Sequence, residues 1–126
     1  VATACGLATR AQITKPGFFD ALGGSTQRLV DGLAHAARDA QIDFCGDSQG
    51  GMFGFFFAPS LPAHYTAVMA TDKERFNRFF HAMLERGIYL APALYEAGFV
   101  SAAHGKAEIG ATIDAARAAF ANLAHA

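Results

Sequence analysis

The sequence predicts an α+β fold: a small, mostly antiparallel sheet of three to four strands with helices packed on one face. Three observations lead to this prediction. Two short strand-forming stretches near the middle of the chain are separated by a polar, glycine-rich break, which is typical of a hairpin. Stretches with helical spacing of apolar residues lie on both sides of that hairpin. The order of elements also lacks the alternation of strands and helices that builds a parallel sheet.

Two helices are expected in the first third of the chain. Val1 to Ile13 is a run of mostly small residues, and Thr14-Lys15-Pro16-Gly17 ends it because the residue before a proline disfavours the helical conformation. Phe18 to about Ala40 is the second helical region, with Leu22, Leu29 and Leu33 at helical spacing. Gly23-Gly24-Ser25 is expected to kink or interrupt it.

Residues 42–57 are expected to form the hairpin. Ile42 to Cys45 is the first strand, and Gly51 to Phe57, rich in phenylalanine, is the second and sits at the centre of the sheet. Asp47, Ser48 and Gln49 are assigned to the turn. These residues also complete Gly46-Asp47-Ser48-Gln49-Gly50, the G-x-S-x-G pattern of a serine-hydrolase elbow. An elbow needs a helix after its serine, whereas a strand follows here, so the turn interpretation is favoured.

The second half contributes two further helices and two short strands. Residues 60–70 receive no assignment. Thr71 begins a helix with a capping box, Thr71-Asp72-Lys73-Glu74, and Gly87 ends it. Short strands are predicted at Ile88–Leu90 and Gly98–His104, and the last helix at about Lys106–Leu123. Phenylalanines and aliphatic residues line one face of each helix: Phe76, Phe79, Phe80, Met83 and Leu84 in one, and Ile109, Ile113, Ala116, Phe120 and Leu123 in the other.

Composition excludes several classes of protein. With 52% hydrophobic and 17% charged residues the chain is not disordered, and its ten scattered basic residues make no stripe for nucleic acid. No stretch has the pattern of a membrane span or a signal peptide. The five histidines lack metal-ligand spacing, so no metal site is expected. Cys5 and Cys45 are expected to be reduced, buried thiols of a cytoplasmic protein.

One loop is unusual because it is almost wholly apolar. Leu90 to Phe99 joins two predicted strands and contains a single carboxylate, Glu96. Two interpretations stay open: a surface loop with a solvated glutamate, or a buried loop that presents one acid to a cleft shared with another domain.

Two long motifs carry a resemblance to a known family. The first is Gly50-Gly51-Met52-Phe53-Gly54-x-Phe56-Phe57, and the second is Phe76-x-x-Phe79-Phe80-x-x-Met83-Leu84-x-x-Gly87-Ile88-Tyr89-Leu90-Ala91-Pro92. The second continues as Glu96-Ala97-x-Phe99-x-Ser101-x-Ala103-His104. Together they resemble the glutamate-1-semialdehyde 2,1-aminomutase family over essentially all 126 residues.

The resemblance implies the fold of type I pyridoxal-phosphate enzymes, related to class III aminotransferases, and specifically their C-terminal small domain. Residues 1–15 are then a helix connecting from a large domain, and residues 16–126 are the small domain. The complete enzyme is implied to be a cytoplasmic homodimer, an isomerase of tetrapyrrole (porphyrin) biosynthesis. It exchanges the amino and oxo groups of glutamate 1-semialdehyde through a diamino intermediate and yields 5-aminolevulinate.

The resemblance assigns few functional residues to this chain. Glu96 matches an active-site glutamate over the substrate pocket, and Pro92, Ala93 and Tyr95 are expected to shape that wall. Ala93 stands where the family usually has Ser, and Tyr95 where it usually has Phe. Lys15, Lys73 and Lys106 do not match the Schiff-base lysine. The cofactor, pyridoxal or pyridoxamine 5'-phosphate, is therefore expected in the large domain, and this chain alone is expected to be inactive and without cofactor.

Two alternatives remain beside the aminomutase. One is the small domain of another class III aminotransferase, which usually carries an Arg here to grip a substrate carboxylate. Residues 87–104 contain no Arg. The other is a stand-alone, non-catalytic interaction module, which does not explain the specific motifs.

Overall fold

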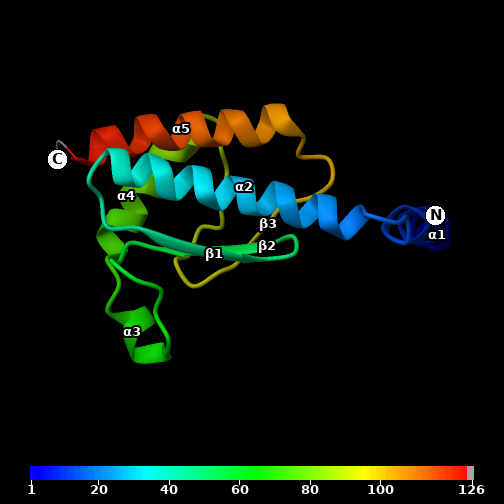
Figure 1. Cartoon of the computed structure of the whole chain (residues 1–126), viewed down its shortest axis with the longest axis horizontal. Helices are drawn as coiled ribbons and strands as arrows, with labels where there is room; N and C mark the ends of the chain where they lie inside the picture. Colours follow the sequence, from blue (N-terminus) through cyan, green and yellow to red (C-terminus); the bar gives the residue numbers. More distant parts are fainter. Residues whose placement is uncertain (125–126) are drawn as a thin grey trace.

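The computed structural model describes residues 1–124. Its elements, shown in Figure 1, follow one another as α1 (Ala2–Ile13), α2 (Phe18–Asp39), β1 (Cys45–Gln49), β2 (Met52–Phe56), α3 (Tyr65–Met69), α4 (Lys73–Leu84), β3 (Gly98–Phe99) and α5 (Lys106–Ala124).

The sheet has three antiparallel strands in the order β1-β2-β3, so the phenylalanine-rich strand β2 lies at its centre. Helices α2 and α5 run side by side over one face, and the short helix α3 projects on the other side (Figure 1). The predicted α+β fold with helices on one face is thereby confirmed.

A cluster of phenylalanines forms the core between the sheet and the helices. Phe79 of α4 stacks on Phe120 of α5 with ring centroids 4.6 Å apart. Phe55 and Phe57, which alternate with less buried neighbours along the end of the hairpin, meet the Phe79 ring edge-on at 5.8 and 5.6 Å. The alternation follows from the two-residue period of a strand, which sends successive side chains to opposite faces.

The hairpin is confirmed, but its register differs from the prediction. The first strand begins at Cys45 and extends through Gln49, so Asp47, Ser48 and Gln49 are strand residues. The turn is Gly50-Gly51, with Gly50 at φ 58°. A two-residue hairpin loop needs such a positive φ, which glycine adopts at little cost, and this requirement decides the register.

The four predicted helices are present, with two corrections. Helix α2 runs through Gly23-Gly24-Ser25 as one continuous helix of 22 residues, so the predicted interruption is wrong. The N-cap of α4 is Asp72, whose carboxylate accepts the Arg75 N–H at 2.8 Å. Thr71 instead donates its hydroxyl to the Val68 carbonyl at the end of α3, which the sequence had left unassigned.

The strands of the second half are shorter than predicted. Ile88–Leu90 is not a strand: Ile88 and Leu90 pack their side chains against the core without strand pairing. Of Gly98–His104 only Gly98 and Phe99 pair with β2, opposite Phe53 and Met52. Within residues 1–124, the edge of β2 beyond Phe53 therefore has no partner strand on that side.

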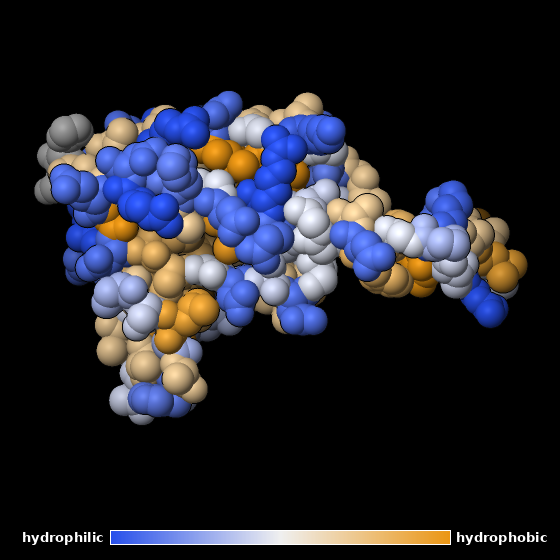
Figure 2. Space-filling view, viewed as in Figure 1, coloured by the Kyte–Doolittle hydropathy of each residue, from blue (hydrophilic) through white to orange (hydrophobic). Residues whose placement is uncertain are grey.

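Helix α1 extends away from the body and buries none of its residues. Figure 2 shows apolar surface on this arm, where Leu7 and Ile13 are exposed. Cys5 on the same helix is exposed too, which corrects the prediction of a buried thiol, and Cys45 is half-buried. Within residues 1–124, no helix combines the length and apolar character needed to cross a membrane.

Gly98 occupies a position that excludes a side chain. A Cβ placed on Gly98 would collide with the ring of Phe53, and Phe53 is buried. We expect Gly98→Ala to displace that ring and to lower the free energy of unfolding by about 1–3 kcal/mol, as overpacking of a core does. Gly54→Ala on strand β2 is the matched control, because a Cβ there meets nothing within 4 Å. Equal urea midpoints for the two variants would contradict this account.

Candidate functional site

The G-x-S-x-G motif does not form a nucleophile elbow. Ser48 lies within strand β1, opposite Phe53, and a strand rather than a helix follows it. Its hydroxyl donates to the side-chain oxygen of Gln27 at 2.9 Å, so an amide and not a histidine is its partner. An amide cannot take the hydroxyl proton, and the serine therefore has no general base.

We expect Ser48 to be inert toward a fluorophosphonate probe, because such probes report an activated serine. The measurement is intact-mass spectrometry of the chain after incubation with the probe, with Ser48→Ala as the control. Stoichiometric labelling of the natural chain that disappears in the variant would restore the hydrolase interpretation.

A cavity of about 410 Å³ opens between the unpaired edge of β2, the segment from Gly87 to Val100 and the first half of α5. Its volume is within the range of small-molecule sites. Part of the wall is made by buried core side chains: Leu29, Phe53, Phe55, Phe76, Leu94, Val100 and Ile109. Because these side chains are packed in the core, the part of the cavity that they line has a fixed shape.

The structure brings two of the four predicted site residues to this cavity. Glu96 and Ala93 line it, and the Glu96 N–H donates to the Ala93 carbonyl at 3.0 Å in a turn. Pro92 is exposed and Tyr95 is 51% exposed, and neither lines the cavity. Leu94 is buried and anchors the segment between them. The segment is thus anchored in the core while Glu96 stays exposed at the cavity, and the cleft shared with another domain stays a prediction.

Three polar residues of the opposite wall were not predicted. His104, Glu108 and Thr112 line the same cavity from the turn before α5 and from its first turns. Their spacing of four residues is a signal that the sequence contains, because residues four apart share one face of a helix. His104 also belongs to the second family motif, although no role was assigned to it.

The cavity formed within residues 1–124 offers no cationic group to pyridoxal phosphate. No Lys or Arg lines the cavity, so neither a Schiff-base amine nor a cationic phosphate contact is available there. Lys15 donates to Gln12 at 2.6 Å, and Lys73 and Lys106 are exposed at the first positions of α4 and α5. Among residues 1–124, no group of three or more His, Cys, Asp or Glu could hold a metal ion.

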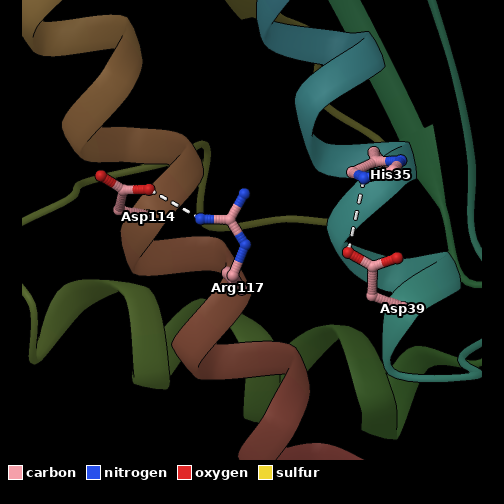
Figure 3. A network of polar contacts seen from close by, with 4 residues as sticks. All are labelled: His35, Asp39, Asp114 and Arg117. Carbon is pink, nitrogen blue, oxygen red and sulfur yellow. Dashed lines mark hydrogen bonds and ion pairs between the residues drawn. The ribbon is translucent and has the colours of Figure 1, made fainter.

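Polar contacts elsewhere are typical of a solvated surface. Figure 3 shows the pairs His35–Asp39 on α2 and Asp114–Arg117 on α5, each within one helix and exposed. Exposed pairs of this kind contribute about 0–1 kcal/mol and indicate no site. Burial raises the pKa of the Cys45 thiol, which makes it a poor nucleophile.

Comparisons with known proteins show what the chain is similar to. No family model matches it. It is 67% identical over 124 residues to the glutamate-1-semialdehyde 2,1-aminomutase of Leptothrix cholodnii, a match that covers 95% of this chain and 28% of that protein. The structure of an omega-transaminase from Sphaerobacter thermophilus superposes on the chain with a TM-score of 0.75 and is 26% identical to it in sequence. The superposition covers 89% of this chain and 25% of the transaminase. A transaminase with bound PLP, 20% identical, shares the fold with a TM-score of 0.68, over 90% of this chain and 26% of its own. The chain is therefore similar, over nearly its whole length, to a segment that spans about a quarter of a glutamate-1-semialdehyde 2,1-aminomutase.

Proposed function

We propose that the chain is the C-terminal small domain of a pyridoxal-phosphate enzyme that converts glutamate 1-semialdehyde into 5-aminolevulinate for tetrapyrrole biosynthesis. Residues 16–126 are the domain, and residues 1–15 connect it to the rest of the protein. The observation that carries the proposal is the 67% identity, across nearly the whole chain, to a protein of that name.

The proposed division of labour follows from the residues present. The cofactor supplies the amino-group chemistry when it is bound, and its contacts belong to the part of the protein outside this chain. This chain contributes the wall of the substrate site through Glu96, whose carboxylate can hold an ammonium group or accept a proton. Buried Leu94, two residues before it, fixes that wall to the domain core.

The exposed apolar surface supports a missing partner. Met52 and Phe99 stand opposite each other on β2 and β3 and are 43% and 69% exposed. No helix of residues 1–124 covers that face of the sheet (Figure 1). Helix α1 is also unburied. Both surfaces are therefore available to pack against a large domain and against the second subunit of a cytoplasmic homodimer.

The two alternatives are less well supported. A class III aminotransferase grips a substrate carboxylate with an arginine, whereas Glu96 and Glu108 line this cavity and no arginine does. An interaction module needs no apolar cavity of about 410 Å³ with an acid at its wall.

The whole protein tests the proposal. Supplied with glutamate 1-semialdehyde alone, it is expected to form 5-aminolevulinate without an external amino donor, because the amino group moves within one molecule. A class III aminotransferase needs a separate amine and oxo acid. Product formation only when an amine is added would replace the aminomutase with that alternative. Saturable, borohydride-trappable pyridoxal phosphate on one lysine of the isolated chain would contradict the division of labour.

A further inference from the structure

The α5 wall of the cavity holds a histidine to which the proposed function assigns no role. His104 faces the cavity together with Glu96, from the turn that precedes α5. Glu108 and Thr112 continue the same wall. Polar residues in a cavity that is otherwise lined by buried phenylalanines and aliphatic residues can orient a ligand.

The turn fixes the imidazole of His104. Its Nδ1 accepts the Ser101 N–H at 3.1 Å, while its own backbone N–H donates to the Ser101 carbonyl at 3.0 Å. The Ser101 hydroxyl oxygen in turn accepts the Ala103 N–H at 3.2 Å. Because Nδ1 is an acceptor here, the neutral ring carries its proton on Nε2.

Several side chains that line the cavity can donate a hydrogen bond. Among them, His104 has an N–H whose direction is fixed by the turn. The Thr112 hydroxyl already donates to the Glu108 carbonyl at 2.8 Å. The Tyr89 hydroxyl and the His104 ring are both exposed, but within residues 1–124 only the His104 ring is held by a hydrogen bond. Nε2 of His104 makes no hydrogen bond to any side chain or backbone group of residues 1–124. A held N–H donor without a protein partner can be satisfied by an acceptor on a ligand.

We propose that His104 is a further substrate-binding residue, whose Nε2–H donates a hydrogen bond to the carboxylate of the substrate. This inference rests on the proposed function. Glu96 and Glu108 leave the cavity wall rich in carboxylates, which repel an anionic oxygen. A directed N–H offsets that repulsion at one point, and so it selects how a substrate with an amino end and an oxygen-rich end is oriented.

The test uses the whole protein and levulinate, which has oxo and carboxylate oxygens but no amine, so binding is measured without turnover. His104→Gln places an amide N–H near the position of Nε2, whereas His104→Asn places an oxygen near Nδ1 and keeps only the turn contact. By calorimetry, we expect the Gln variant to bind levulinate within about 3-fold of the natural protein. The Asn variant is expected to bind about 10-fold more weakly, the loss of one hydrogen bond to a charged group.

His64→Asn is the matched control. Nδ1 of His64 also accepts a backbone N–H, from Ala67 at 3.3 Å, but His64 does not line the cavity. Its replacement is expected to leave levulinate binding unchanged.

Three results would overturn the role of His104: equal weakening in the Gln and Asn variants, an Asn variant that binds as well as the natural protein, or no saturable levulinate binding by the natural protein. Turnover of glutamate 1-semialdehyde is measured alongside. Its absence, with the Gln and Asn variants still distinguished by levulinate, refutes the proposed reaction and leaves the His104 contact standing.

Discussion

Replacing Phe79 with Ala is expected to lower the free energy of unfolding by about 3–5 kcal/mol. Phe79 has no exposed surface, stacks on Phe120 and meets Phe55 and Phe57 edge-on. Deleting its ring loses the transfer energy of the side chain and leaves a cavity between three other rings that cannot collapse freely. Domains of this size have a total stability of about 5–15 kcal/mol, so the variant is expected to be close to unfolded at 37 °C.

Urea unfolding followed by circular dichroism measures the effect. The control is Leu84→Ala on the same helix, because Leu84 is 44% exposed and its loss is expected to cost less than about 1 kcal/mol. Similar midpoints for the two variants would show that α4 does not anchor the core. A non-cooperative melt of the natural chain would show that the domain needs the rest of the protein to fold.

The sequence predicted those parts of the fold that periodicity decides. Helix α4 and helix α5 were found because Phe76, Phe79, Phe120 and their neighbours repeat at helical spacing over three or more turns. The central position of β2 was predicted from its phenylalanines, because aromatic residues favour a strand and need a buried face to pack against.

The errors occurred where two local preferences compete. Asp47-Ser48-Gln49 and Gly50-Gly51 both favour a turn. The turn forms at the glycines because it needs a positive φ at one position, and Gly50 adopts that φ at little cost. Thr71 and Asp72 can both cap a helix, and Thr71 was already engaged by the Val68 carbonyl. The glycine pair of α2 stays helical because the helix is packed at this point. Leu22 contacts the core, and Gly23 lies beside Gly50 of the hairpin turn.

The site could be predicted only in part because a cavity is a tertiary feature. Glu96 was singled out as the one acid in an apolar loop, and it does line the cavity. His104 and Glu108 come from another element, and nothing in their local sequence shows that α5 faces the loop. Their place at the wall depends on the contact between α5 and the Gly87–Val100 segment across the edge of β2.

In the whole protein, Glu96→Gln is expected to lower turnover of glutamate 1-semialdehyde by at least about 10-fold, since general acid–base groups typically contribute about 100-fold or more. Glutamine keeps the size and a hydrogen-bonding oxygen of the side chain, but it cannot accept a proton or carry a negative charge. In the proposed reaction, the substrate offers an amino group at one carbon and receives one at the next. A carboxylate at the wall can therefore hold the ammonium that is to leave and take protons from the one that is to react. The buried anchor Leu94 is untouched by the substitution, so folding and cofactor content are expected to stay as in the natural protein.

Glu85→Gln separates a loss at the site from a loss of surface charge. Glu85 is exposed at the end of α4 and does not line the cavity, so its replacement makes the same change in net charge away from Glu96. Steady-state assays of both variants, with cofactor content read from absorbance, give the comparison. If the two variants turn over equally fast, Glu96 is only a solvated loop residue, and the acid of the cavity wall takes no part in the reaction. If only Glu96→Gln is slow, with an unchanged KM, the carboxylate acts at the transition state rather than in holding the substrate, because an interaction that serves binding alone raises KM and leaves kcat unchanged.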